Sequence, residues 1–202
     1  MVQAGTLFGY LAAFMTIVIA IAFGDLAISV HRLLRARQRV IWHPIPLLAT
    51  FWVLLVLLTS FFAIWDLTAL SHLSFYGLLW KITPLFLYFL AASAILPDEV
   101  PPHGVDLFSF YLSERGYFYT VLIVGYVLDN GDGLASNWSY LSTHPAFVWS
   151  YVLPVIAGTL ACLVAMLWRT EKWVHWSALT VLFIASHFGF ASWSINGASA
   201  IG

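Results

Sequence analysis

Long stretches of the chain are almost wholly apolar, and short polar or proline-containing segments separate them. Apolar runs of about 18 residues or more are transmembrane candidates, because a helix needs ~20 residues to cross ~30 Å of hydrocarbon. Helix-ending signals lie between the runs, among them His43-Pro44 and Pro101-Pro102. The pattern predicts six transmembrane helices, at residues 5–34, 45–70, 73–96, 105–130, 146–168 and 172–194.

The fourth predicted helix is the least apolar of the six. Its hydrophobic part, from Tyr117 to Leu128, is too short to span a bilayer alone. It must include the more polar segment DLFSFYLSERG that precedes it, or be tilted or shielded by its neighbours. The segment from Asn130 to Gly133 predicts the end of this helix, which would leave Asp129 and Asp132 in a connection.

Composition agrees with a membrane protein. The chain is 62% hydrophobic and 8% charged, with a mean hydropathy of +0.92, whereas a soluble domain carries roughly 25% charged residues. We therefore predict an all-α integral membrane bundle in the lipid bilayer, with residues 1–202 as one domain. Arginines rather than a cleavage site follow the first apolar run, which favours a retained span over a signal peptide. No basic patch with interleaved aromatic residues points to nucleic acid.

The distribution of lysine and arginine predicts the orientation. Seven of the eight fall in or beside connections that share one side of a six-span bundle. Basic residues concentrate on the cytoplasmic side, so both termini should lie outside. The seven residues are Arg32, Arg35, Arg37, Arg39, Arg115, Arg169 and Lys172.

The eighth basic residue, Lys81, lies inside the third predicted helix. A lysine at mid-membrane costs about 2.5–3.5 kcal/mol, so it needs a partner or water. Asp66 lies at a similar depth on the antiparallel second helix, and we expect the two to pair. The pair would fix helix register or form part of an ion or proton pathway. Lys81 reaching outward to the interface is the third interpretation.

Helical spacing places mildly polar residues on one stripe of the second, third and sixth spans. Three stripes that meet would form an intramembrane polar seam. At the cytoplasmic end of the first span, Asp25 and Arg32 share a face and predict a local charge pair. The predicted seam contains Thr59, Asp66, Lys81, Tyr88, Thr180 and His187.

His187 lies in mid-span in the segment IASHFGFAS, among small residues. Imidazole is a common axial ligand of haem, so His187 is either the ligand of a tetrapyrrole or bonded to a neighbouring helix. The other six histidines lie at or near the predicted interfaces, which argues against a buried bis-histidine haem. A tetrapyrrole or a carotenoid is the cofactor class we expect if the protein binds one.

Small residues line one face of the first and fifth spans and predict close helix packing, within the chain or between subunits. Packing between subunits would make a homo-oligomer or part of a larger membrane complex. On the first span these residues are Gly5, Gly9, Ala13, Ala20, Gly24 and Ala27, and on the fifth Gly158, Ala161 and Ala165.

Two segments carry a resemblance to a known group of proteins. The opening FGYLAAFMTIVIAIAFGDLAISVHRLLRARQRVIWH is similar to the start of uncharacterised bacterial multi-pass inner-membrane proteins, which have an RLIRARGRV-like basic turn. The segment GVDLFSFYLSERGYFYTVLIVGYVLD resembles their VDLRxYYxxxRRWFFGLL-like stretch, with Gly116 in place of the second arginine. The resemblance covers about two-thirds of the chain and implies a bacterial inner membrane, with no activity and no site. The matching residues are Val105, Asp106, Leu107, Tyr111, Arg115 and Phe118.

The sequence leaves three hypotheses on function. We find no HExxH, GxSxG, P-loop or dinucleotide motif and only one cysteine, Cys162, so we assign no catalytic or metal-binding residues. We favour a non-enzymatic accessory or scaffold subunit that packs against other membrane proteins. The first alternative is a small channel or proton-coupled transporter that uses Asp66, Lys81 and His187. The second is a pigment-, haem- or lipid-binding protein with His187 as ligand.

Overall fold

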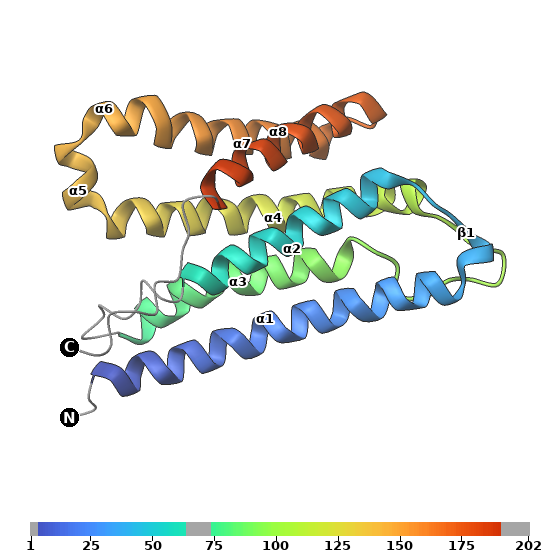
Figure 1. Cartoon of the computed structure of the whole chain (residues 1–202), viewed down its shortest axis with the longest axis horizontal. Coiled ribbons are helices and arrows are strands. Elements are labelled where there is room, and N and C mark those ends of the chain that lie inside the picture. The colour runs from blue at the N-terminus through green and yellow to red at the C-terminus, as the bar shows by residue number, and fades with distance from the viewer. Residues whose placement is uncertain (1–3, 64–73, 191–202) are drawn as a thin grey trace.

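The computed structural model describes residues 4–63 and 74–190, and side chains over 9–62 and 74–186. Six long helices make up most of this part of the chain (Figure 1). They are α1 (Ala4–Arg35), α2 (Pro44–Ala63), α3 (Phe75–Ala94), α4 (Leu107–Ser136), α7 (Leu153–Trp168) and α8 (Lys172–Phe190). The shorter elements are η1 (Arg37–Arg39), α5 (Trp138–Thr143), α6 (Pro145–Phe147), the π-helical turn η3 (Val148–Val152), and the strands β1 (Val40–Ile41) and β2 (Val105–Asp106).

Helix α4 lies at the centre of the bundle. It packs along α3 for much of its length, contacts α7 on another side, and touches α2. Figure 1 shows α1 along one side of the molecule and α7 with α8 along the other, with α2, α3 and α4 between them. The largest buried side chains of α4 are Tyr111, Phe118 and Tyr119, each at most 1% exposed. Neighbouring helices therefore shield the least apolar of the predicted spans.

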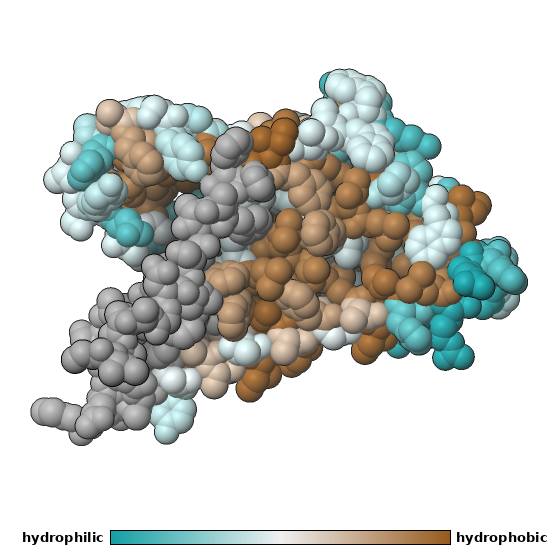
Figure 2. Space-filling view, in the orientation of Figure 1, coloured by the Kyte–Doolittle hydropathy of each residue, from teal (hydrophilic) through white to brown (hydrophobic). Residues whose placement is uncertain are grey.

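Four helical segments of the described chain are long and apolar enough to cross a membrane, so the chain is an all-α membrane protein. Figure 2 shows a broad hydrophobic area over the middle of one face and hydrophilic residues at its ends. Helices α4 and α8 are not among these four, and the six-span count and the position of the termini remain predictions. The four segments are Gly9–Arg35, Pro44–Phe62, Phe75–Ala94 and Pro145–Trp168.

The predicted end of the fourth helix is wrong. Helix α4 continues through Asn130 and Gly133 to Ser136, and α5 follows after one residue. The side chain of Asn130 donates to the carbonyl of Tyr126 one turn back, at 2.9 Å, and so does not cap or break the helix. Among the described residues, only Gly104 has a positive φ, so Gly133 does not terminate the helix. As a consequence, Asp129 and Asp132 lie on α4 itself.

The basic connections gather at one end of the bundle. Strands β1 and β2 pair in parallel, with Val40 opposite Val105. Gly104 has φ of +91°, and a Cβ there would lie 2.5 Å from the carbonyl oxygen of Arg39, so only glycine fits. Arg115 Nε donates to the carbonyl of Leu167 at 3.3 Å, which brings the start of α4 to the end of α7. The charge pattern grouped these same connections, but the side of the membrane they occupy remains a prediction.

Candidate functional site

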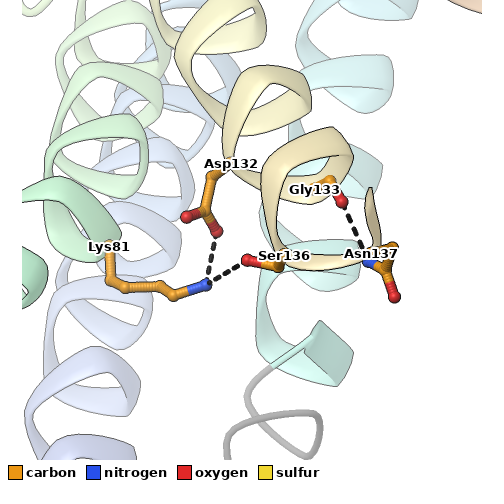
Figure 3. A network of polar contacts seen from close by, with 5 residues as sticks. All are labelled: Lys81, Asp132, Gly133, Ser136 and Asn137. Atoms are coloured by element: carbon orange, nitrogen blue, oxygen red, sulfur yellow. Dashed lines mark hydrogen bonds and ion pairs between the residues drawn. The ribbon is translucent and has the colours of Figure 1, made fainter. Parts of the chain in front are cut away.

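Lys81 forms an ion pair with a residue that the sequence placed in a loop. Its Nζ lies 2.5 Å from Asp132 Oδ2 and 3.5 Å from Ser136 Oγ (Figure 3). The Lys81 and Asp132 side chains are each 21% exposed. Asp66, the partner that the sequence predicts, lies outside the described residues. In the described chain the charge of Lys81 is therefore balanced from α4.

A second contact joins the same two helices. Tyr88 lies seven residues after Lys81, on the same face of α3. Its hydroxyl donates to Asp129 Oδ2 at 3.1 Å, and Asp129 lies three residues before Asp132 on α4. Tyr88 is 1% exposed, whereas Asp129 is accessible at the surface. We call these two contacts, Lys81–Asp132 and Tyr88–Asp129, the α3–α4 ladder.

Gly125 allows α3 and α4 to come close enough for the ladder. A Cβ at this position would lie 3.0 Å from Tyr88 Cε1 and 3.2 Å from Leu87 Cβ. Such contacts are tighter than ordinary van der Waals contacts, so a side chain here would push the helices apart. Gly125 and Asp129 are one turn apart, and Gly125 therefore packs against the ring whose hydroxyl Asp129 binds.

The other residues of the predicted polar seam do not join this contact. Thr59 donates to the carbonyls of Leu55 and Val56 on its own helix. Thr180 is exposed and donates to the carbonyl of Trp176, one turn back. The side chain of His187, like Asp66, lies outside the described residues. The structure therefore places Lys81 and Tyr88 on a seam between α3 and α4, where the sequence predicts one between the second, third and sixth spans.

Asp25 and Arg32 are not paired in the structure. Arg32 Nη1 instead donates to the carbonyl of Asp98 at 2.7 Å. Within the part of the chain that the structure describes, the ion pairs are Lys81–Asp132 and Arg169–Glu171. Arg32 therefore ties the end of α1 to the connection between α3 and α4.

At the basic end of the bundle, a buried hydrogen-bonded chain joins α4, α7 and α8. His175 is 0% exposed, and its Nε2 lies 3.0 Å from the carbonyl oxygen of Arg169. A carbonyl only accepts, so Nε2 carries the proton and Nδ1 of the neutral ring accepts from Tyr111 at 2.7 Å. The one proton of Tyr111 is then used, so Tyr119, at 2.5 Å, donates to Tyr111 rather than to Met166 Sδ on α7, a weaker acceptor at 3.1 Å. We call this the His175–Tyr111–Tyr119 chain.

Sequence reasoning missed the His175–Tyr111–Tyr119 chain and the α4 half of the ladder. The sequence analysis places His175 at or near an interface, and burial of its ring against α4 leaves no pattern in the local sequence. The ladder has a weak signal: Asp129 and Asp132 are three residues apart, which puts two carboxylates on one face if the helix continues. Gly131 and Gly133, which are typical of a helix end, pointed instead to a connection at this place.

A cavity of about 370 Å³ lies beside the ladder, between the end of α4, α5, η3 and the start of α7. Asp129, Asn130 and Asn137 contribute polar groups to its wall, and Tyr140, Phe147 and Ile156 contribute apolar surface. The turn η3, whose Val152 lines the cavity, is π-helical. Such turns occur often at functional sites.

No family model matches the chain, and the comparisons with curated proteins and with solved structures give no match. Among the described residues, no three histidine, cysteine, aspartate or glutamate side chains are grouped so that they could hold a metal ion. The fold therefore defines the class, a helical membrane protein.

Proposed function

We propose that the protein is a non-enzymatic accessory or scaffold subunit of a bacterial inner membrane that packs against other transmembrane helices, in the first instance a second copy of itself. The observation that carries this proposal is the outward position of the small-residue face of α1. This helix buries Leu11, Met15 and Ile19 against the rest of the bundle. The opposite side is exposed and is formed by Gly9, Ala13, Ala20, Gly24 and Ala27.

The space around the two glycines supports an intermolecular role. Apart from adjacent residues and the backbone of α1 itself, no atom lies within 4 Å of a Cβ built on Gly9 or Gly24. Lipid tails solvate bulky apolar residues as well as small ones, but small residues let a second helix backbone approach and gain van der Waals contacts. Helix α7 repeats the feature, since a Cβ on Gly158 also meets nothing and Ala161 is exposed.

Site-specific photo-crosslinking in native membranes tests this proposal. A photo-reactive residue at Ala20 should give a discrete adduct between tagged and untagged copies. The same residue at Ile21, which is 55% exposed but lies about 100° away around the helix, should react with lipid and give none. Gly24→Leu should reduce the adduct from Ala20. Equal adducts from Ala20 and Ile21, or none from either, would reject the α1 face as the interface.

The ladder favours a small channel or proton-coupled transporter as a second candidate function. Lys81 and Asp132 form a partly exposed charge pair beside a cavity, as a pathway residue pair would. In liposomes, Lys81→Met should then abolish ion or proton flux while the protein remains folded, and unchanged flux excludes the role.

The pigment hypothesis has its own test. A His187→Ala variant with an unchanged visible spectrum would exclude His187 as the ligand.

A further inference from the structure

The cavity beside the ladder presents an unbalanced negative charge. Lys81 contacts Asp132 directly, so those two charges offset each other. Among the described residues, the Asp129 carboxylate receives one hydrogen bond, from the hydroxyl of Tyr88, and a phenol carries no positive charge. Within the described residues, no cation lies within ion-pair distance of Asp129.

The two side-chain amides beside Asp129, those of Asn130 and Asn137, can also act as hydrogen-bond acceptors. The Nδ2 groups of Asn130 and Asn137 each donate to a backbone carbonyl four residues earlier, at 2.9 Å. The Nδ2 group of each is thus bonded within the helix, and the amide oxygen is the atom left to accept a hydrogen bond. A carboxylate with amide oxygens nearby matches a ligand that donates hydrogen bonds and carries positive charge.

The remaining walls suit an apolar or aromatic body. Phe147 and Ile156 line the cavity on the side of η3 and α7, and Tyr140 lines it from α5. Aromatic faces also attract cations, which adds to the carboxylate. The volume of about 370 Å³ lies within the range of ~300–1,000 Å³ that small-molecule sites commonly have.

We propose that this cavity binds an amphiphilic organic cation, with a protonated amine at Asp129 and an apolar or aromatic body between Phe147, Tyr140 and Ile156. Asp132 is held by Lys81 and does not compete for the amine. The proposal does not depend on the exposed face of α1, so either can fail without the other.

Equilibrium dialysis tests the proposal on the full chain in nanodiscs of zwitterionic lipid, with empty nanodiscs as background. The probe is 4-phenylbutylammonium, and its matched partners are neutral 4-phenylbutanol and anionic 5-phenylpentanoate. We expect saturable binding of the ammonium probe, and affinities about tenfold or more lower for the alcohol and the carboxylate. Equal binding of all three probes would overturn the proposal.

Variants locate the binding. Asp129→Asn should weaken binding of the ammonium probe about tenfold or more, and Glu114→Gln, which removes a carboxylate near the other end of α4, should leave it unchanged. Ile156→Trp should fill the cavity and block binding while Asp129 stays intact. This second variant keeps the test decisive if Asp129→Asn does not fold. Undiminished binding by a folded Asp129→Asn or Ile156→Trp protein would place the probe elsewhere and reject the site.

Discussion

Helix α4 carries one polar cluster near each end, and the two differ in kind. The His175–Tyr111–Tyr119 chain is formed by neutral groups that are at most 1% exposed, and each is bonded to the next. The α3–α4 ladder contains charged groups, is partly exposed, and borders a cavity. Both clusters join α4 to its neighbours. Only the ladder contains a charged group, Asp129, that has no ion-pair partner among the described residues.

The difference follows from the cost of burial. A neutral polar group can be buried if its donors and acceptors are paired. In the His175–Tyr111–Tyr119 chain, three side chains and the carbonyl of Arg169 are hydrogen-bonded to one another. A carboxylate needs a counter-charge or access to polar surroundings as well. The first arrangement stabilises the fold, and the second leaves Asp129 able to bind a ligand.

The largest effect is expected where the closed chain is broken. His175→Ala leaves a cavity and removes the acceptor for Tyr111, and should lower the free energy of unfolding by about 3 kcal/mol. Denaturant titration of the protein in bicelles measures the change. His144→Ala, at an exposed histidine, should cost much less. Similar losses for both variants would contradict a structural role for the chain.

A somewhat smaller effect is expected at the close contact between α3 and α4. Gly125→Val places side-chain atoms against Tyr88 and Leu87 and should cost about 2 kcal/mol through overpacking. Gly116→Val is the matched control, because a Cβ at Gly116 of the same helix meets nothing within 4 Å. The control should unfold at nearly the same denaturant concentration as the parent. A neutral Gly125→Val would show that the two helices pack less closely here.

The ion pair of the ladder should contribute less, because both side chains are partly exposed. A double-mutant cycle with Lys81→Met and Asp132→Asn should give a coupling energy of about 1 kcal/mol or less, but above zero. The same cycle with Asp66→Asn measures the pair that the sequence predicts. Coupling between Lys81 and Asp66, with none between Lys81 and Asp132, would contradict the Lys81–Asp132 ion pair.

The smallest effect is a pH dependence at His43, outside the predicted spans. Partial burial and the nearby charge of Lys172 lower the pKa of His43 below its ordinary value of 6.5. Its Nδ1 faces the N–H of Ile45 at 3.3 Å, and its ring lies 4.5 Å from that of Phe108. The folded protein therefore binds this proton less readily than the unfolded chain does. The contribution to stability is full above pH 6.5 and is lost as the pH falls through 6.5 toward the folded pKa.

Thermal unfolding at several pH values between 7.5 and 5 measures this dependence. His43→Gln should show a smaller loss of stability on acidification than the parent. His144→Gln is the control and should keep the parent's pH response. If His43→Gln and the parent respond alike, another group carries the dependence.

Part of the candidate site could be predicted from the spacing of residues within a single helix. Lys81 and Tyr88 share a face because they are seven residues apart, and their helix follows from its apolar composition. The partners of these residues could not be read in this way. Asp129 and Asp132 were expected in a loop because Gly131 and Gly133 resemble helix-ending residues, but packing of α4 against α3 keeps this segment helical.

The amino-acid sequence by itself determined the class of this protein, because the length and apolarity of a helix and the grouping of basic residues are properties of local stretches. Only the tertiary structure decided which groups meet. The partner of Lys81, the burial of His175 and the cavity beside Asp129 depend on which helices are neighbours and at what register. That choice is made by contacts between residues far apart in the sequence, such as Tyr111 and His175, which are 64 positions apart, and no short sequence pattern records it.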